Sequence, residues 1–310
     1  MVEKILFMGR PSMGKTTIKK VVFEKENPDD LILFPLDATI STKYSVYDFM
    51  DLKLSLLDTA GQSLPIYLSD KDKQMEIFGD TSILIYIFDY NIWLSNPQDV
   101  LDDIKTIYKI IEIDENGAKF FLFFHKIDLV YHVNEELLSL LKSRVLNQLD
   151  LPVELPIYFT SLHPKLIFSI YNAFFDVLGN FSIEILTLKN VVQKILKKLS
   201  KTICFITNKD DYIINHIETK DFDVDLIHPL HEKIYNISKS SENLTTIDNV
   251  SKIIEVKSKF FYIAIDSISE FHPNFKSAII ISEILNIEKL IEILKEMKTL
   301  NITNQQRNDN

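Results

Sequence analysis

Residues 9–16 of this chain read Gly-Arg-Pro-Ser-Met-Gly-Lys-Thr, a complete G-x-x-x-x-G-K-[ST] phosphate loop. Residues 4–8 before the loop form a short apolar run typical of a buried strand, and residues 17–23 after it continue as an amphipathic helix. The motif depends on this order of strand, glycine loop and helix start. The alternative is a glycine loop that merely caps a helix, and that alternative leaves the lysine and the threonine unexplained.

The two glycines suit the loop to a phosphate ligand. Gly9 and Gly14 allow the main chain to turn so that consecutive N–H groups face one polyanion, at the positive end of a helix dipole. Lys15 is predicted to reach the β- and γ-phosphates, and the Thr16 hydroxyl is predicted to ligate Mg²⁺. The residues expected to contact the nucleotide here are Gly9, Arg10, Pro11, Ser12, Met13, Gly14, Lys15, Thr16 and Thr17.

The first 180 residues alternate strand-like with helix-like segments, which predicts an α/β domain built on a parallel sheet. Residues 44–50 would pair with a strand at residues 53–57 as a hairpin. Gly179 and Asn180 would end the last helix of this domain. Further strands are expected at residues 82–88, 120–124 and 157–159, and helices at residues 99–112, 135–148 and 164–177.

The remainder of the chain is predicted to be a smaller α+β unit, because no glycine follows Gly179 and helices flank the strands. Strands are expected at residues 202–207, 212–217, 252–256 and 260–265, with a polar turn at residues 208–211, and helices at residues 183–199, 227–237 and 280–297. The predicted organisation is a first domain over residues 1–181, a second over residues 182–298 and a disordered tail at residues 299–310.

Composition narrows the possible partners and location. A net charge of −10 disfavours an electrostatic grip on nucleic acid. A single cysteine, Cys204, excludes an internal disulfide framework and suits a reducing cytosol. No apolar run approaches the length of a bilayer span, and no signal peptide, myristoylation start or prenylation box is recognisable. We therefore expect a cytoplasmic protein without a direct lipid anchor.

A second motif, Asp58-Thr59-Ala60-Gly61-Gln62, follows the strand at residues 53–57. Asp58 is predicted to hold Mg²⁺ through a bound water, and the Gly61 N–H to meet the γ-phosphate. Gln62 would orient the water that attacks this phosphate. A lone D-x-x-G pattern is weak, but its position after a phosphate loop and at the end of a buried strand makes it specific.

The segment His125-Lys126-Ile127-Asp128 ends the strand at residues 120–124 and is a variant of the N-K-x-D box that recognises guanine. Asp128 would accept hydrogen bonds from guanine N1–H and N2–H₂, which adenine lacks. The Lys126 stem would pack over the base, and Ser161 would close over the base edge. His125 replaces the usual asparagine, so either its bracing of the phosphate loop is altered or it is a strand-end histidine with no contact to the ligand.

An irregular segment, residues 37–40 with the sequence Asp-Ala-Thr-Ile, lies between the first helix and the hairpin. Thr39 is the candidate for gripping Mg²⁺ and the γ-phosphate only in the GTP state, so that hydrolysis would release the segment. Ser41 and Thr42 are competing candidates, and an ordinary loop threonine is the remaining alternative.

With these elements in order, the first 180 residues resemble a Ras-like small GTPase, and more narrowly the Rag/Gtr branch. The His-Lys-x-Asp form of the guanine box at residues 125–128 supports that narrower resemblance. Residues 20–23, followed by Asn27 and Pro28, are similar to the first helix of C/D-type Rag subunits, whereas residues 37–40 are closer to the A/B type, so the subtype stays open. Residues 75–78, followed by the run at 84–89, are similar to the Rag sequence after switch II.

The resemblance implies a P-loop NTPase domain of the Ras-like type, with GTP or GDP and Mg²⁺ as ligands, followed by a roadblock-like dimerisation domain. It also implies pairing with a second Rag-type subunit, homologous or identical, and recruitment of scaffold and effector proteins. The setting would be an internal membrane, reached through a partner, in nutrient signalling upstream of the TOR kinase. The apolar residues of segment 280–297 and of the hairpin strands are a further reason to expect dimerisation.

Arg10 and Pro11 depart from the small residues of fast-switching Ras-type loops. They would crowd the γ-phosphate and an incoming arginine finger, so hydrolysis is expected to be slow or dependent on a partner. Arg10 itself is read either as a solvated loop arginine or as a finger supplied in cis. Two functions remain in competition: a GTPase in which Lys15 and Gln62 are catalytic, and a nucleotide-binding scaffold whose main role is assembly. A P-loop kinase or ATPase is disfavoured by the guanine box.

Overall fold

A computed structural model describes residues 2–34, 36, 37, 39, 41–49, 52–114, 117–130, 135–163, 166–179, 181–209, 213–227, 229–231, 233–234, 250–271 and 273–308. The chain divides into two compact units, Met1–Ala173 (unit 1) and Phe174–Asn310 (unit 2). This division lies upstream of the domain boundary predicted after residue 181, and the domain limits of the sequence stay a prediction.

Unit 1 contains a six-stranded sheet in the order β2-β3-β1-β4-β5-β6. The strands are β1 (Val2–Met8), β2 (Lys43–Phe49), β3 (Leu52–Asp58), β4 (Ile83–Asp89), β5 (Lys119–His125) and β6 (Ile157–Phe159). The helices are α1 (Lys15–Phe23), α2 (Pro28–Leu33), α3 (Leu64–Ser69), α4 (Lys71–Phe78), α5 (Tyr90–Ser95), α6 (Pro97–Asp114) and α7 (Glu135–Leu149), with 3-10 turns η1 (Gly61–Ser63) and η2 (Ile127–Leu129). The next helix, α8 (Phe168–Leu178), begins in unit 1 and ends in unit 2.

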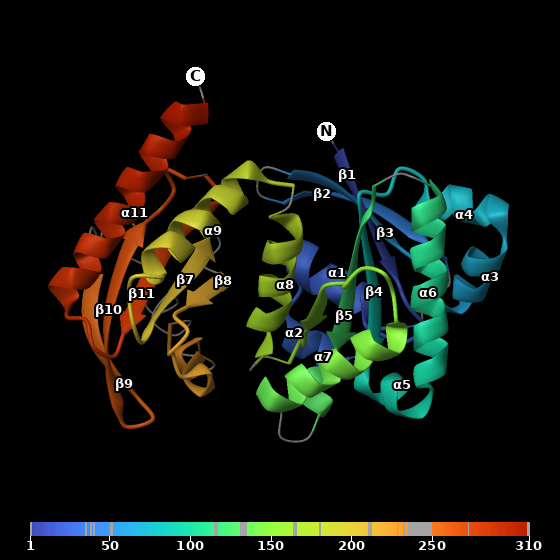
Figure 1. The fold of residues 1–310 in the computed structure, drawn as a ribbon, viewed down its shortest axis with the longest axis horizontal. Helices are drawn as coiled ribbons and strands as arrows, with labels where there is room; N and C mark the ends of the chain where they lie inside the picture. Colours follow the sequence, from blue (N-terminus) through green and yellow to red (C-terminus); the bar gives the residue numbers. More distant parts are fainter. Residues whose placement is uncertain are drawn as a thin grey trace. The chain divides into compact units, whose positions relative to one another are not determined.

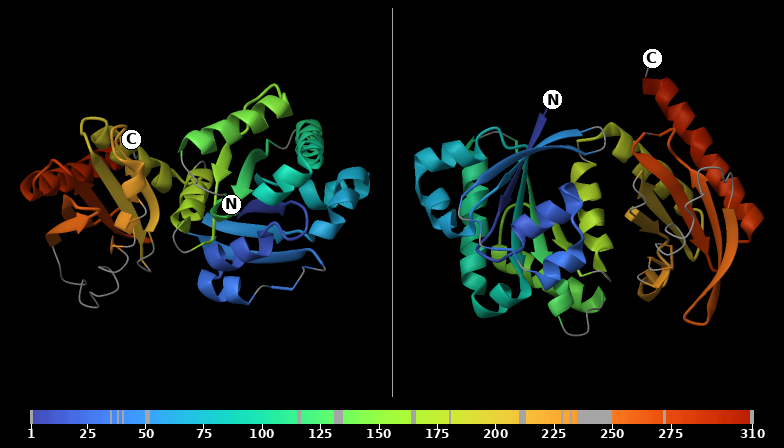
Figure 2. Two further views of the ribbon diagram at one scale, coloured as in Figure 1. Left: turned by 90° about the horizontal axis from the view of Figure 1, so that it is seen from below. Right: turned by 180° about the vertical axis from the view of Figure 1, so that it is seen from behind.

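The predicted α/β domain with a parallel sheet is confirmed. β1 pairs in parallel with both β3 and β4, β4 with β5 and β5 with β6, while β2 is antiparallel to β3 and completes the expected hairpin. Every residue of β4 is buried, since helices cover both faces of the sheet. One face carries a continuous apolar core with α3 to α7, and α1 lies on the opposite face (Figures 1 and 2).

Unit 2 contains a five-stranded sheet in the order β8-β7-β11-β10-β9, with antiparallel pairing throughout. Figure 1 shows α9 beside α11, and α11 also packs on β10 and β11. The antiparallel sheet with packed helices agrees with the predicted α+β class. The elements are α9 (Ile183–Leu196), β7 (Thr202–Asn208), β8 (Ile213–Glu218), η4 (Val224–Leu226), β9 (Val250–Val256), β10 (Lys259–Ser267), β11 (Phe275–Ser282) and α11 (Ile287–Asn308).

The helix predicted at residues 280–297 is wrong at its start. Residues 275–282 form β11, which lies at the centre of the sheet, and α11 begins only at Ile287. The apolar run at residues 278–281 is short and buried, and periodicity cannot distinguish such a run from a buried helix. The Asn286 side chain accepts a hydrogen bond from the Lys289 N–H (3.0 Å), which marks the true start of the helix.

Four apolar side chains of this segment have a different role from the one expected, whereas Ile284 is exposed. Ile280, Leu290, Leu294 and Met297 are buried in the core of unit 2, so they offer no surface to a second subunit. At the other end, α11 runs to Asn308 and so continues into the residues for which a disordered tail is predicted.

Several sequence expectations fall partly outside the described residues. They concern Ala38 and Ile40 of the Thr39 segment, Met50 of the hairpin, Pro164 of the predicted helix before Gly179, Asn180, the turn and strand start at residues 210–212, and residues 228, 232 and 235–237 of the predicted helix 227–237. Within the described part of the chain, no helix is both long and apolar enough to cross a membrane.

Candidate functional site

Buried polar side chains lie at or just after the carboxyl ends of the parallel strands in unit 1. Lys15 follows the loop after β1, Asp58 ends β3, Asp89 ends β4, His125 ends β5 and Thr160 follows β6. Because these strands run in the same direction, their ends meet at one edge of the sheet. This edge is where open α/β sheets bind ligands.

The phosphate loop wraps around the ammonium group of Lys15. Its Nζ donates to the carbonyl oxygens of Gly9 (2.6 Å) and Arg10 (2.8 Å), and burial lowers the pKa of Lys15 to about 8. Gly9 has a φ of 143°, and a Cβ there would lie 2.2 Å from the Ile87 carbonyl oxygen. Only glycine therefore allows the loop to pass this close to β4. Pro11 and Ser12 are exposed, whereas Met13 is buried.

The residues predicted to bind the metal come together at the start of α1. The Thr16 hydroxyl donates to Asp58 Oδ2 (2.7 Å) and lies 2.7 Å from Thr39 Oγ1. Asp58 is fully buried, and its Oδ1 has no hydrogen-bond partner among the described residues. Burial raises the pKa of this carboxyl group, with the Thr16 hydrogen bond acting in the opposite direction.

This donor set fits a magnesium ion that is shared with a phosphate ligand. Two hydroxyl groups and one carboxylate are the hard oxygen ligands that Mg²⁺ prefers, and the unpaired Asp58 Oδ1 is an available acceptor. In the described ranges, no group of three or more His, Cys, Asp or Glu side chains could hold a metal. The remaining ligands would therefore be phosphate oxygens and water.

Gly61 packs directly against the phosphate loop. A Cβ at Gly61 would lie 2.5 Å from Pro11 N and 2.6 Å from the carbonyl carbon of Arg10. The motif after β3 thus touches the backbone that surrounds Lys15. Gln62, the next residue, is exposed at the surface of η1.

The guanine box is linked to the phosphate loop by Lys126. Its Nζ donates to the Ser12 carbonyl oxygen (2.6 Å) and to Asp89 Oδ2 (2.8 Å). Asp128 is exposed, and the Ser161 hydroxyl donates to its Oδ1. Ser161 Oγ in turn accepts from the His163 N–H (2.9 Å), which fixes the hydroxyl that orients the carboxylate.

His125 contacts the phosphate loop from the side of the box. A Cβ at Gly14 would lie 2.8 Å from His125 Cδ2, and His125 Nδ1 lies 2.9 Å from Thr160 Oγ1. Burial lowers the pKa of His125 to about 4, so the ring is neutral at physiological pH. The histidine therefore packs between the loop and the segment after β6, which favours a bracing role over an isolated strand-end histidine.

Arg10 adopts neither of the two arrangements considered from the sequence. Its guanidinium group turns to α6, where it pairs with Asp103 (2.8 Å) and Asp99 (2.9 Å). The backbone of Arg10 remains part of the loop around Lys15, because its carbonyl oxygen accepts from Lys15 Nζ (2.8 Å). The side chain is therefore not free in solvent, and its donors are engaged away from Lys15.

Sequence reasoning missed two acidic residues at this site. Asp89 accepts from Lys126 and also from the Ile92 N–H (3.0 Å), so it links the guanine box to the start of α5. Its place directly after a predicted buried strand was a usable signal, because that position belongs to the ligand-binding edge. Asp103 carried no such signal, since acidic residues are common on the exposed faces of helices.

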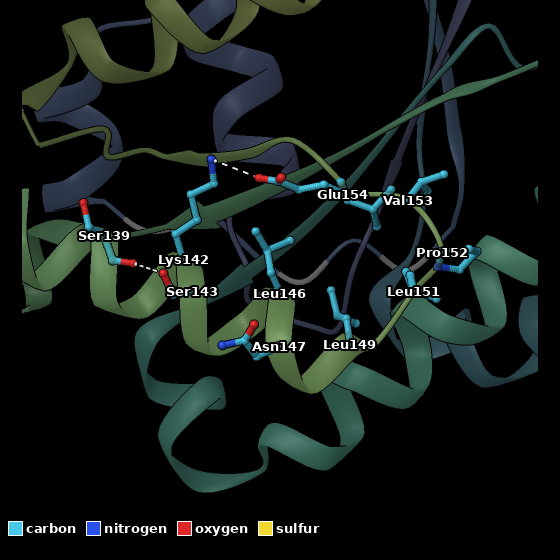
Figure 3. A pocket seen from close by; sticks show the side chains of 11 residues that line it. Ser139, Lys142, Ser143, Leu146, Asn147, Leu149, Leu151, Pro152, Val153 and Glu154 are labelled. Carbon is cyan, nitrogen blue, oxygen red and sulfur yellow. Dashed lines mark hydrogen bonds and ion pairs between the residues drawn. The ribbon is translucent and has the colours of Figure 1, made fainter.

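A hollow of about 610 Å³ lies elsewhere in unit 1, between α7 and the segment that leads to β6 (Figure 3). Figure 3 shows Lys142 reaching from α7 toward Glu154, and the two charged groups are 3.5 Å apart. The residues predicted to bind nucleotide do not line this hollow. The candidate site is therefore the edge of the sheet and not this surface depression.

The sheet order, the loop after β1 and the motifs after β3 and β5 together define a Ras-like P-loop domain. A family model described as the Gtr1/RagA G protein conserved region matches residues 4–254, which is most of the chain. The chain therefore belongs to the Gtr1/RagA family of small GTPases.

Individual relatives agree with this assignment. The chain is 29% identical over 176 residues to "Ras-related GTP-binding protein A" of Dictyostelium discoideum, covering 56% of each protein. It is 28% identical over 179 residues to "GTP-binding protein gtr1" of Schizosaccharomyces pombe, covering 56% of this chain and 55% of that protein. It is 30% identical over 132 residues to "GTP-binding protein GTR1" of Saccharomyces cerevisiae, covering 41% and 40%. The chain thus spans about half the length of the relatives it matches.

Proposed function

We propose that this chain is a guanine-nucleotide switch of the Rag/Gtr type that binds GTP and GDP together with Mg²⁺. The observation that carries the proposal is the position of Lys126, whose ammonium group bonds to the phosphate loop at Ser12 while its own segment carries Asp128. A phosphate site and a guanine-reading carboxylate are thereby held at the two ends of one edge, as a nucleotide requires.

Base selection would depend on Asp128 and Ser161. An ionised carboxylate accepts from the two guanine donors, N1–H and N2–H₂, and adenine leaves it unpaired. The Ser161 hydroxyl fixes Asp128, and the stem of Lys126 would cover the base plane. His125 would support the arrangement through its packing on Gly14.

At the phosphate end, Lys15 would transfer its hydrogen bonds from the loop carbonyls to the β- and γ-phosphates, with the N–H groups of the loop and Thr17 around them. Thr16, Thr39 and Asp58 would hold Mg²⁺, which supplies charge neutralisation to the phosphates when bound. Gln62 would orient the attacking water. Loss of the Thr39 contact after hydrolysis would release its segment, which is the switching step.

We expect hydrolysis to be slow or to depend on a partner. Pro11 stands where fast-switching Ras-type loops have a small residue, and its ring would crowd the γ-phosphate. The ion pairs of Arg10 keep its guanidinium group away from the reacting phosphate, so an arginine finger would have to come from an activating protein.

The resemblance to Rag proteins extends the proposal to assembly. Unit 2 would be a roadblock-like domain that pairs with a second Rag-type subunit, and the pair would recruit scaffold and effector proteins. The protein would be cytoplasmic and would reach an internal membrane through a partner, in TOR-type nutrient signalling. Ile280, Leu290 and Met297 are buried within unit 2 while Ile284 is exposed, so the dimer proposal rests on the family resemblance more than on segment 280–297.

Calorimetric titration of the purified chain with GTP, GDP and ATP tests the base specificity. We expect guanine nucleotides to bind far more tightly than ATP, and Asp128→Ala to abolish that binding. Glu255→Ala, which removes an exposed carboxylate of β9, is the control and should bind as the unaltered chain does. Equal affinity for ATP would contradict the proposal. Light scattering of the same sample, alone and with a candidate second subunit, tests dimerisation.

The engagement of the Arg10 guanidinium group by α6, which leaves the loop without a finger in cis, also favours a second candidate function, a scaffold that holds nucleotide without hydrolysing it. Single-turnover hydrolysis of GTP, with and without a candidate activating protein, separates the two. Turnover that is lost in Gln62→Leu supports the GTPase, and absence of turnover under both conditions supports the scaffold.

A further inference from the structure

Arg10 connects the phosphate loop to a helix that carries none of the nucleotide-binding motifs. Its Nε and Nη2 donate to the two oxygens of Asp103 (2.8 and 3.1 Å), and its Nη1 donates to Asp99 Oδ2 (2.9 Å). A two-pronged arginine–carboxylate pair of this kind fixes orientation as well as charge. The partners lie 93 and 89 residues away along the chain, so only the fold brings them together.

Asp103 also accepts a hydrogen bond from the central sheet of unit 1. It is 8% exposed, and the hydroxyl of the fully buried Tyr86 on β4 donates to its Oδ2 (2.7 Å). The hydrogen bond to Asp103 raises the pKa of Arg10, while burial and the Asp103 charge raise that of Tyr86. At neutral pH the guanidinium group is therefore charged and the phenol keeps its proton. Asp103 therefore accepts hydrogen bonds from both Arg10 and Tyr86, and neither donor loses its proton at neutral pH.

The backbone of Arg10 faces the nucleotide site from the opposite side. Its carbonyl oxygen accepts from Lys15 Nζ (2.8 Å). Its carbonyl carbon lies 2.6 Å from the position that a Cβ at Gly61 would occupy. A displacement of Arg10 would therefore move an acceptor of Lys15 and the surface on which Gly61 rests.

We propose that Asp103 and Tyr86 are positioning residues that hold the phosphate loop in its binding conformation through Arg10. This inference rests on the proposed nucleotide function and adds α6 to its machinery. A loop fixed in advance loses less conformational freedom when it binds, so a bound nucleotide is retained for longer.

The test is the rate of release of a fluorescent GDP analogue from the full chain. Asp103→Asn should release it about 10-fold faster, which corresponds to about 1.4 kcal/mol and lies within the coupling expected for contacting side chains. Tyr86→Phe should act in the same direction with a smaller factor. Asp102→Asn is the matched control, because Asp102 lies on the same helix but bonds to Gln98 (2.8 Å), and its release rate should not change.

A double-mutant cycle separates the anchor from general stability. Arg10→Gln and Asp103→Asn should each speed the release of the GDP analogue. The double variant should release it no faster than the faster of the two single variants. If Asp103→Asn releases GDP at the rate of the unaltered chain, the inference is overturned, whether or not the variant melts at a lower temperature. The proposed function is not affected by that result. Slower single-turnover hydrolysis in Arg10→Gln with unchanged release would instead identify a finger in cis and also overturn it. Failure of the unaltered chain to bind guanine nucleotide overturns the proposed function and this inference together.

Discussion

In unit 1 a set of buried polar side chains (Lys15, Asp58, Asp89, His125 and Thr160) lies at or just after the carboxyl ends of parallel strands, whereas in unit 2 Thr202 and Thr207 pair with serines across an antiparallel sheet. Thr202 Oγ1 donates to Ser282 Oγ (3.0 Å), and Thr207 Oγ1 lies 2.7 Å from Ser277 Oγ. In unit 1, Lys15 is held by loop carbonyls and Asp58 keeps one oxygen unpaired within the described structure.

The difference shows how to distinguish a site from a satisfied core. Buried polar groups that bond to each other contribute to stability and leave nothing for a ligand. A buried carboxylate oxygen without a hydrogen-bond partner at the ligand-binding edge, such as Asp58 Oδ1, is retained at the expense of stability, which is typical of functional positions. We therefore expect matched substitutions in the two units to separate binding from stability.

The largest expected effect is at Lys15. Lys15→Met should weaken GDP binding about 1,000-fold, because charge-assisted hydrogen bonds to phosphate are lost, each contributing about 1.5–3 kcal/mol. The same variant without ligand should melt at a higher temperature, since burial holds the pKa of Lys15 low and the ammonium group is unfavourably desolvated. Titration calorimetry and thermal melting measure the two effects.

Lys298→Met is the counterpart in unit 2 and should behave in the opposite way. It removes the partner of Asp266 (2.9 Å), so melting should occur at a lower temperature while GDP affinity is unchanged. Loss of GDP affinity in this variant would contradict the inference that this ion pair of unit 2 contributes to stability alone.

The next effect is the dependence of stability on pH, which both units share. Burial lowers the pKa of His125 in unit 1 and of His216 in unit 2 to about 4, from the usual 6.5. Between pH 6.5 and 4 the unfolded chain therefore binds protons that the folded chain does not, and stability falls as pH falls. Each histidine should contribute a loss on the order of 3 kcal/mol, complete by about pH 4.

Urea unfolding at pH 7 and at pH 5 measures the part of this loss that falls between these two values, on the order of 2 kcal/mol for each histidine. His125→Asn and His216→Gln should each reduce it. Saturating GDP should protect unit 1 by mass action, while the contribution of His216 should persist. An unchanged pH dependence in both variants would show that other groups are responsible.

A smaller effect is expected for metal removal. EDTA should speed the release of GDP from the unaltered chain about 10-fold, because it removes the Mg²⁺ ion that neutralises the charge of the phosphates. Asp58→Asn should release GDP at one rate with or without EDTA. Asp266→Asn is the control from unit 2, because that buried carboxylate is already paired with Lys298, and it should keep the EDTA response. An EDTA response of equal size in Asp58→Asn would remove Asp58 from the proposed metal site.

The smallest effects compare two fully buried threonines. Thr202→Val in unit 2 and Thr160→Val in unit 1 should each cost about 1 kcal/mol of stability, because a buried hydrogen-bond partner is left unpaired. Only Thr160→Val should also weaken GDP binding, by a few-fold, since Thr160 orients the His125 ring that packs on Gly14. Equal GDP affinity in both variants would limit His125 to a role in folding.

The sequence predicted the parallel sheet and the strands that end in motifs, because alternating segments, glycines and apolar runs are local signals. It also predicted that Thr16, Thr39 and Asp58 would meet, although Ser41 and Thr42 remained competitors. The structure brings Thr39 to Thr16, while Thr42 Oγ1 lies 2.7 Å from the Tyr67 hydroxyl instead. The start of α11 was predicted wrongly, because the run at residues 278–281 is apolar on both faces and carries no periodicity.

By itself, then, the sequence determined the motifs of the phosphate loop and the guanine box, the alternation of strands and helices that predicts a parallel sheet, and the family, since each is a pattern of residues that are neighbours along the chain. Only the tertiary structure decided which polar groups pair. Arg10 pairs with Asp103 because α6 packs beside the loop. Asp89 pairs with Lys126 because β4 and β5 are adjacent strands. The physical reason is that an ion pair depends on distances of a few ångströms across the fold, and spacing along the chain does not encode those distances.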